Sequence, residues 1–167
     1  NTSGVIQAGE QLLLQDVFDT LFGLTSANGA LRITTSHPDV KVTSRTYNAA
    51  GAHGTYGQFI PALDRSHALE PGVVGSLQQL REHPGQVDFR TNIGLLNLTP
   101  EVAEVEIDLF LGSGNQVATR SVTLQPYEMR QEDRIFATVG YATVESACAV
   151  VRVVSDGGLV MSYASVA

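Results

Sequence analysis

The side chains best suited to binding are three aromatic residues, Tyr47, Tyr56 and Phe59, which lie close together in the sequence. Aromatic rings exposed on a β-sheet stack on sugar rings or pack against a partner chain. Aromatic side chains also fill hydrophobic cores, and the residue types alone leave that explanation open. We therefore treat the three residues as a candidate contact surface for a ligand or a partner.

The spacing of the histidines argues against a metal site. His37, His53, His67 and His83 are 14 to 16 residues apart, and none has a second ligand at the close spacing of a zinc site. The carboxylates of "EVEIDL", residues 104–109, alternate along a predicted strand, whereas calcium requires a dense cluster of oxygen atoms. We therefore predict no metal and no cofactor, and we expect the histidines to lie exposed in loops.

Motifs for covalent or nucleotide chemistry are also missing from the sequence. Cys148, in "SACAVVRVV", is the one cysteine, so no disulfide can form within the chain, and we expect a small buried side chain there. No G-x-S-x-G motif occurs, and the glycine-rich "AAGAHGTYGQ" lacks the lysine of a phosphate-binding loop. The sequence thus predicts a protein that is not an enzyme.

Charge and hydropathy exclude further classes of partner. The 167 residues carry a net charge of -7, and the ten basic residues are scattered singly, whereas nucleic acid binding requires clustered cations. No apolar run reaches the ~20 residues of a membrane-spanning helix, and no signal peptide pattern opens the chain. We expect either a cytosolic protein or a mature or excised piece of a secreted one. Asn1–Ser3 and Asn97–Thr99 fit the N-glycosylation pattern.

Alternating apolar residues predict a hairpin in the second half of the chain. Every second residue from Val105 to Leu111 is apolar, "GSGN" supplies a turn, and "QVATRSVTL" reads as the returning strand. If the register keeps the apolar face intact, Arg120 shares the outer face with Glu106 and Asp108. The acidic outer face and this arginine favour the pairing.

Further β-rich runs predict an all-β, sandwich-type fold. "ALRITTS" and "VKVTSRTYN" flank a turn at His37–Asp39, and "CAVVRVVS" and "LVMSYASV" flank one at Asp156–Gly158, so we expect a hairpin at each site. Residues 87–99 form another predicted strand, with Gly94 as a bulge.

Two similar sequence segments, which we call the repeated phrase, interrupt the β pattern. "QDVFDTLFG", residues 15–23, and "EDRIFATVG", residues 132–140, both place apolar residues at i, i+1 and i+4, which predicts short helices that end at a glycine. Phe18 aligns with Phe136 at an offset of 118, and Arg32 with Arg152 at 120. We infer an internal repeat, with a short helix before the closing hairpin of each unit and with the two phenylalanines as buried equivalents.

The two copies are unequal in length. Residues 1–48 form an incomplete first copy, residues 49–86 a connector that packs on the sandwich, and residues 87–167 a complete second copy. The first copy lacks the strands that would cover its sheet. Either the connector covers it or a strand from another chain does, which would produce an assembly.

Four phrases, "SRTYN" at 44–48, "GTYGQFIPA" at 54–62, "FRTNIGLLN" at 89–97 and "SYASV" at 162–166, resemble a tandem module of large secreted bacterial proteins. The resemblance implies an extracellular, Ig-like β-sandwich repeat with no settled activity, often located beside proteases or other β domains.

Together these features predict a non-enzymatic extracellular structural or adhesive module that assembles by strand pairing, either as a homo-oligomer or with neighbouring domains. The alternative is a carbohydrate-binding module that uses Tyr47, Tyr56 and Phe59 to bind a polysaccharide. The third hypothesis is a small hydrolase without a recognisable motif.

Overall fold

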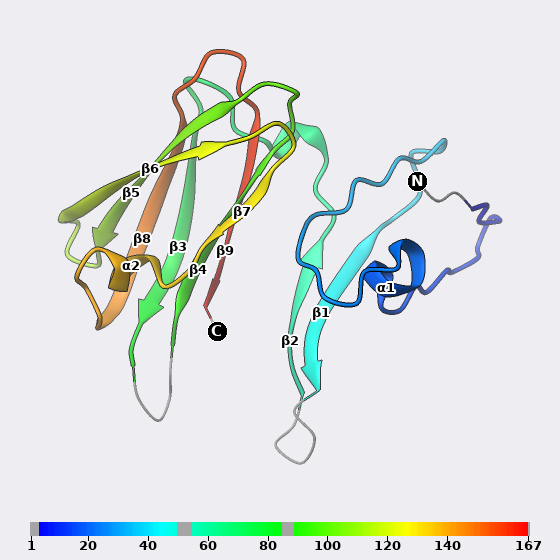
Figure 1. The fold of residues 1–167 in the computed structure, drawn as a ribbon, viewed down its shortest axis with the longest axis horizontal. Helices are drawn as coiled ribbons and strands as arrows, with labels where there is room; N and C mark the ends of the chain where they lie inside the picture. The colour runs from blue at the N-terminus through cyan, green and yellow to red at the C-terminus, as the bar shows by residue number, and fades with distance from the viewer. Residues whose placement is uncertain (1–3, 50–54, 85–88, 167) are drawn as a thin grey trace. The chain divides into compact units, whose positions relative to one another are not determined.

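The computed structural model describes residues 4–49, 55–84 and 89–166, whose regular structure is mostly antiparallel β-strand (Figure 1). This confirms the all-β fold class. The chain divides into two units, residues 1–31 and 32–167.

A sandwich of two antiparallel sheets occupies the second half of the chain. One sheet has the strand order β3, β8, β5, β6, and the other has the order β7, β4, β9. The first sheet consists of β3 Val74–Glu82, β8 Val144–Val153, β5 Ala103–Leu111 and β6 Gln116–Leu124. The second consists of β7 Met129–Glu132, β4 Thr91–Asn97 and β9 Val160–Val166. The sheets share one core, whose largest fully buried side chains include Leu80, Ile93, Leu95, Ile107, Leu109 and Phe136.

The sandwich begins before the second copy that the sequence suggested. β3 lies inside the predicted connector and pairs with β8 as an edge strand of the four-stranded sheet. Ahead of it, a 3₁₀ turn at Arg65–His67 leads to Leu69, whose backbone pairs with Val160 at the start of β9. The sequence from Leu69 onward is therefore part of the sandwich.

The hairpin of β5 and β6 is confirmed, but the predicted position of Arg120 is wrong. In the observed register Arg120 lies opposite Ile107, so it is on the same side of the sheet as that buried residue. Its guanidinium reaches Glu132, 3.1 Å away. A register shift between Leu109 and Phe110 sets this alignment, and a one-residue slip moves a side chain to the opposite face.

The predicted hairpin of β8 with β9 is also wrong. The turn at Asp156–Gly158 carries the chain from one sheet to the other, because β8 is paired on both sides, with β3 and with β5. β9 instead pairs with β4. The Ser155 hydroxyl supports the crossing by accepting a hydrogen bond from the Glu104 N–H at 3.0 Å.

Gly94 lies in a regular ladder between β7 and β9, so the predicted bulge is wrong. The neighbouring Tyr163 ring explains the glycine, because a Cβ at position 94 would lie 2.0 Å from Tyr163 Cε1. The Tyr163 hydroxyl lies 3.1 Å from Gln131 Oε1, across the strand that carries Gly94. Gly94 therefore leaves space for an aromatic ring.

Both predicted helices are present, as α1 Val17–Phe22 and α2 Ile135–Thr138. Phe136 is fully buried, whereas Phe18 is half-buried, so the expectation of two buried equivalents is wrong for Phe18. The physical reason is that α2 packs into the core of the sandwich, while α1 has no buried residue.

The strands predicted around His37–Asp39 do not pair with each other. Residues 23–42 form no strand, and β1 Thr43–Ala49 pairs with β2 Thr55–Pro61. The shared order of elements in the predicted repeat is thus limited to the two helices in the described residues, and the duplication itself stays a prediction.

Candidate interaction surfaces

The β1–β2 hairpin brings two of the three candidate aromatic residues onto one face. Arg45 pairs with Phe59, and Tyr47 pairs with Gly57 two positions along, so all four residues lie on the same side of the ladder. Tyr47 and Phe59 are each 62% exposed. We call Arg45, Tyr47, Gly57 and Phe59 the aromatic face.

Tyr56 is not part of this face. Its backbone pairs with Asn48, which is a position on the opposite side of the ladder. Its side chain lies outside the described residues.

Two members of the aromatic face were missed by the sequence analysis. The Arg45 guanidinium carbon lies 5.8 Å from the centre of the Tyr47 ring, within the range of a cation–π contact. A Cβ at Gly57 would lie 2.8 Å from Tyr47 Cβ, so the glycine leaves room for the tyrosine. The sequence could have predicted that Arg45 lies beside Tyr47, because the two residues are two positions apart in a predicted strand and therefore share a face. The face offers flat apolar rings and one cation, which suit stacking and packing.

The hairpin also leaves backbone groups available for pairing. Among the described residues, β1 pairs only with β2 and β2 only with β1, so each strand has one free edge. A free strand edge presents a row of N–H and C=O groups that can pair with another strand.

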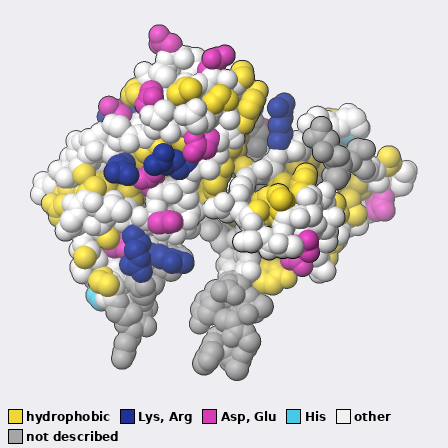
Figure 2. All heavy atoms as spheres, in the orientation of Figure 1, with side chains coloured by type: hydrophobic (Ala, Val, Ile, Leu, Met, Phe, Trp, Pro, Cys, Tyr) yellow, Lys and Arg dark blue, Asp and Glu magenta, His cyan; other side chains and the backbone are white. Residues whose placement is uncertain are grey.

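The second candidate surface is residues 4–42, which we call the N-terminal apolar segment. None of its residues is buried. Figure 2 shows hydrophobic side chains at the surface of the part of the chain that contains α1. The exposed large side chains are Val5, Ile6, Leu12, Leu13, Leu14, Phe22, Leu24, Leu31, Ile33 and Val40. Such a concentration of exposed apolar residues makes the segment a candidate interaction surface.

The charged clusters of the sandwich are structural. Arg152, on β8, binds the carboxylates of Glu106, at 3.1 Å, and of Asp108, and its hydrogen bonds to Glu106 and then Asp108 raise its pKa. Asp108 also accepts from Thr119 Oγ1 at 2.7 Å and from Gln116 Nε2 at 3.1 Å. These charged and polar groups form their hydrogen bonds and ion pairs with one another, on the outer face of the sheet.

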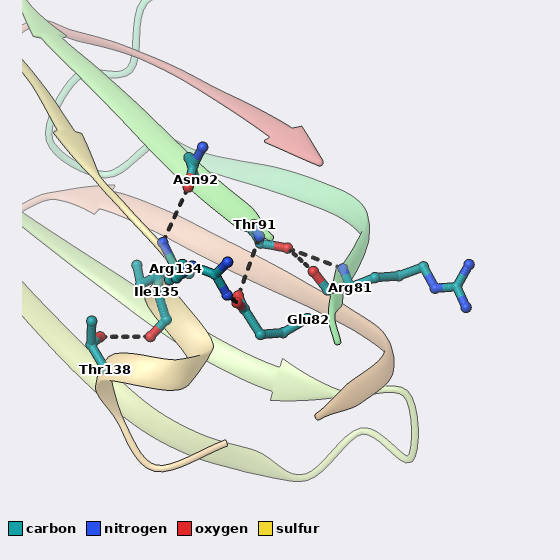
Figure 3. A network of polar contacts seen from close by, with 7 residues as sticks. All are labelled: Arg81, Glu82, Thr91, Asn92, Arg134, Ile135 and Thr138. Carbon is teal, nitrogen blue, oxygen red and sulfur yellow. Dashed lines mark hydrogen bonds and ion pairs between the residues drawn. The ribbon is translucent and has the colours of Figure 1, made fainter. Parts of the chain in front are cut away.

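A second cluster fastens α2 to the sheets (Figure 3). Glu82 is fully buried, and its carboxylate accepts from the Thr91 N–H at 3.2 Å and contacts Arg134 Nη1 at 3.3 Å. The Arg134 backbone N–H donates to Asn92 Oδ1 at 3.1 Å. The residue before α2 is thereby held by β3 through Glu82 and by β4 through Asn92.

The histidines and the cysteine form no site in the described part of the chain, where no group of three or more His, Cys, Asp or Glu side chains could hold a metal ion. His37 and His67 are exposed and lie beside Asp39 and Asp64. His53 lies outside the described residues. Cys148 is half-buried, where the sequence predicted a buried residue.

The structure bears on two features considered in the sequence, the glycosylation triplet at Asn97 and membrane-spanning helices. Asn97 is fully buried, and its side-chain amide donates to the carbonyl oxygens of Glu101 and Gln125, so this glycosylation triplet has a structural role in the fold. Within the described residues, no helix has the length and apolar character needed to cross a membrane.

Comparisons with known proteins give no family. No protein-family model matches the chain. No curated protein matches it. Among solved structures, the Anabaena sensory rhodopsin transducer aligns with 58% of this chain and 90% of its own, at 12% identity and a TM-score of 0.43. A likeness of this degree carries no argument about fold or function.

Proposed function

We propose that this protein is a non-enzymatic structural or adhesive β-sandwich module of the extracellular space, which acts by pairing its exposed strands and apolar residues with a partner. The observation that carries the proposal is that no residue from 4 to 47 or from 57 to 68 is buried, although this part of the sequence is rich in large apolar side chains. When another surface covers this exposed apolar area, the free energy of the two partners falls, so association is favourable.

The contrast with the sandwich supports this proposal. The described residues from Leu69 onward bury eighteen hydrophobic side chains in one core, and ion pairs such as Arg152–Glu106 and Arg134–Glu82 lie within the sandwich. The sandwich is therefore a stable platform, and the exposed N-terminal apolar segment and hairpin are the parts left for association. The resemblance to secreted modules supports the extracellular location, and other copies or neighbouring domains are the partners.

Light scattering after size-exclusion chromatography tests the proposal. We expect the mass in solution to rise with concentration over a roughly thousandfold range, as it does for any associating protein. Leu13→Glu and Ile33→Glu, at side chains that are 71% and 55% exposed, should lower it. Val74→Glu is the matched control, because Val74 is 61% exposed but lies on the sandwich. A monomer at every concentration, or an equal effect of all three variants, would contradict self-association through this segment.

The aromatic face supports a second candidate function, the binding of a polysaccharide. Two rings that are each 62% exposed lie on one side of a strand pair, beside the Arg45 guanidinium. Affinity electrophoresis through gels that contain a soluble polysaccharide tests this function. Retardation that Tyr47→Ala and Phe59→Ala abolish would support it, provided that Tyr127→Ala, at a tyrosine 57% exposed on the sandwich, changes nothing. Equal mobility with and without polysaccharide would exclude the sugars tested.

A further inference from the structure

The two short helices begin in the same unusual way. Each follows a residue in the left-handed region, Asp16 with φ 45 and Arg134 with φ 47. In each, the carbonyl of that residue accepts from a threonine N–H four positions on, at 2.8 Å from Thr20 and 3.1 Å from Thr138. Left-handed backbone is unfavourable for residues with a Cβ, so its presence at both sites, 118 residues apart, indicates one shared local structure.

The helices end differently, because α1 has Gly23 as its C-cap residue and α2 has Val139. The Phe18 carbonyl accepts from the Leu24 N–H at 2.9 Å, and the Phe136 carbonyl accepts from the Tyr141 N–H at 2.9 Å. A glycine with positive φ precedes each donor, φ 67 in the first unit and φ 90 in the second. The first bond spans six residues and the second five, so at the offset of 118 the match covers the start of each helix and not its end.

Only the second helix has surroundings that explain its strained first residue. Arg134 is held by Asn92 of β4 through its N–H and by Glu82 of β3 through its guanidinium (Figure 3). Among the described residues, no acceptor is present for the Asp16 N–H. Strained backbone persists where neighbouring groups fix it, and among the described residues no group holds Asp16 as Asn92 and Glu82 hold Arg134.

The residues that follow the first helix repeat the pattern of β8. Leu31, Arg32 and Ile33 align with Val151, Arg152 and Val153 at an offset of 120. In β8 the two valines are 0% and 3% exposed, whereas Leu31 is 43% and Ile33 is 55% exposed. The same alternation of apolar and basic residues therefore lies uncovered in the first unit.

From these matches we propose that residues 10–42 are the second half of a β-sandwich and bind a polypeptide segment that supplies strands like β3, β4 and β5. Because β8 lies between β3 and β5, residues 30–36 would form a strand between two strands of this partner. The inference deepens the proposed function and rests on its premise that the N-terminal apolar segment is an interaction surface.

The chemistry of the partner follows from the complete sandwich. Arg152 binds carboxylates two residues apart on β5, Glu106 and Asp108, so the partner strand beside Arg32 carries acidic residues at alternate positions. A second partner strand carries an amide side chain that accepts from the Asp16 N–H, as Asn92 does for Arg134. The corresponding strands of a second copy of this chain already pair with its own β7, β8 and β9, so the partner is a different segment of the same kind.

A fusion protein tests the proposal with the intact chain. A second copy of residues 69–126, which contain β3 to β6, is joined through a flexible linker ahead of residue 1. We expect hydrogen exchange at residues 30–36 to slow by at least about a hundredfold, since amides in paired strands open far less often than those in irregular segments. We also expect the added segment to suppress self-association.

Charge reversal in the added segment is the matched control. Lysine at its copies of Glu106 and Asp108 should remove most of the protection in residues 30–36, and Arg32→Glu in the first unit should restore it. Unchanged exchange at residues 30–36 in the original fusion protein would overturn the proposal, as would equal protection with either charge. Self-association of the unfused chain is measured separately, so the proposed function can fail while this inference stands, and the reverse.

Discussion

Truncation of Phe136 to alanine should be among the most destabilising single changes in the sandwich. The ring is fully buried in the core shared by both sheets. A buried phenylalanine removes about 150–250 Å² from water, which at about 25 cal/mol per Å² is roughly 4–6 kcal/mol for the whole side chain. Measured losses for Phe→Ala in cores are about 3–5 kcal/mol, and we expect a loss in this range for Phe136→Ala.

Thermal unfolding followed by circular dichroism measures this loss. The sandwich has about 100 residues, for which 1 kcal/mol shifts Tm by roughly 4–8 °C, so Phe136→Ala should lower Tm by roughly 12–40 °C. Phe18→Ala is the internal control. Phe18 occupies the same place in the repeated phrase but is half-buried and outside the core, so the sandwich transition should change by less than about 0.5 kcal/mol. A loss below about 1 kcal/mol for Phe136→Ala would refute the assignment of this ring to the core.

Three further changes probe the contacts of the sandwich. Gly94→Ala should lower the free energy of unfolding, measured with denaturant, by about 1–3 kcal/mol, because the new Cβ meets the Tyr163 ring. In a double mutant cycle, Tyr163→Ala should recover much of that loss. Strictly additive losses would mean that the ring is not the obstacle. Glu82→Ala should destabilise more than Glu82→Gln, since only alanine leaves the buried Thr91 N–H without an acceptor, and equal losses would rule out this role. Burial and then the Asp133 charge raise the pKa of Tyr163 above its unfolded value of 10.0, so the folded state holds the proton more tightly and stability should fall as pH rises beyond about 10. Tyr163→Phe should flatten that fall, and parallel curves for the two proteins would contradict it.

Local patterns predicted the elements of the fold better than their partners. The alternation from Val105 to Leu111 and the "GSGN" turn are local signals, and they gave the β5–β6 hairpin correctly. The partner of β8 depends on strands distant in sequence, since β3 and β5 occupy both of its edges. Proximity along the chain therefore misassigned β9, although the turn between β8 and β9 was correctly placed.

Register was the other quantity that local patterns did not determine. Arg120 was placed on the outer face with Glu106 by a register expected to keep the apolar face intact, but the observed ladder puts it opposite Ile107. The carboxylates of the outer face are bound by Arg152 from β8, and Arg120 binds Glu132 beyond the sheet. The core residues determine the register, because Val122 and Leu124 are buried opposite Val105 and Ala103 and Arg120 shares their side of the strand.

The candidate contact residues were predictable in part. Tyr47 and Phe59 were selected as aromatic residues close in sequence, and their exposure was one of two open explanations. Their position on one face depends on the β1–β2 register, in which Tyr56 falls on the other side. The sequence favoured residues 30–36 as the partner of β1, so it did not predict the β1–β2 register.

The repeated phrase separates what a short sequence determines from what the whole fold determines. The backbone is alike where the two helices begin, at the left-handed residues Asp16 and Arg134, so the local sequence favours a helix at both sites. Phe136 is fully buried and Phe18 is half-buried, because the sandwich provides a core around Phe136 and no residue of α1 belongs to a core. A helix of six residues is too short to be stable in water by itself. Contacts beyond the helix must therefore stabilise α1, and we propose that a partner which covers the N-terminal apolar segment supplies them.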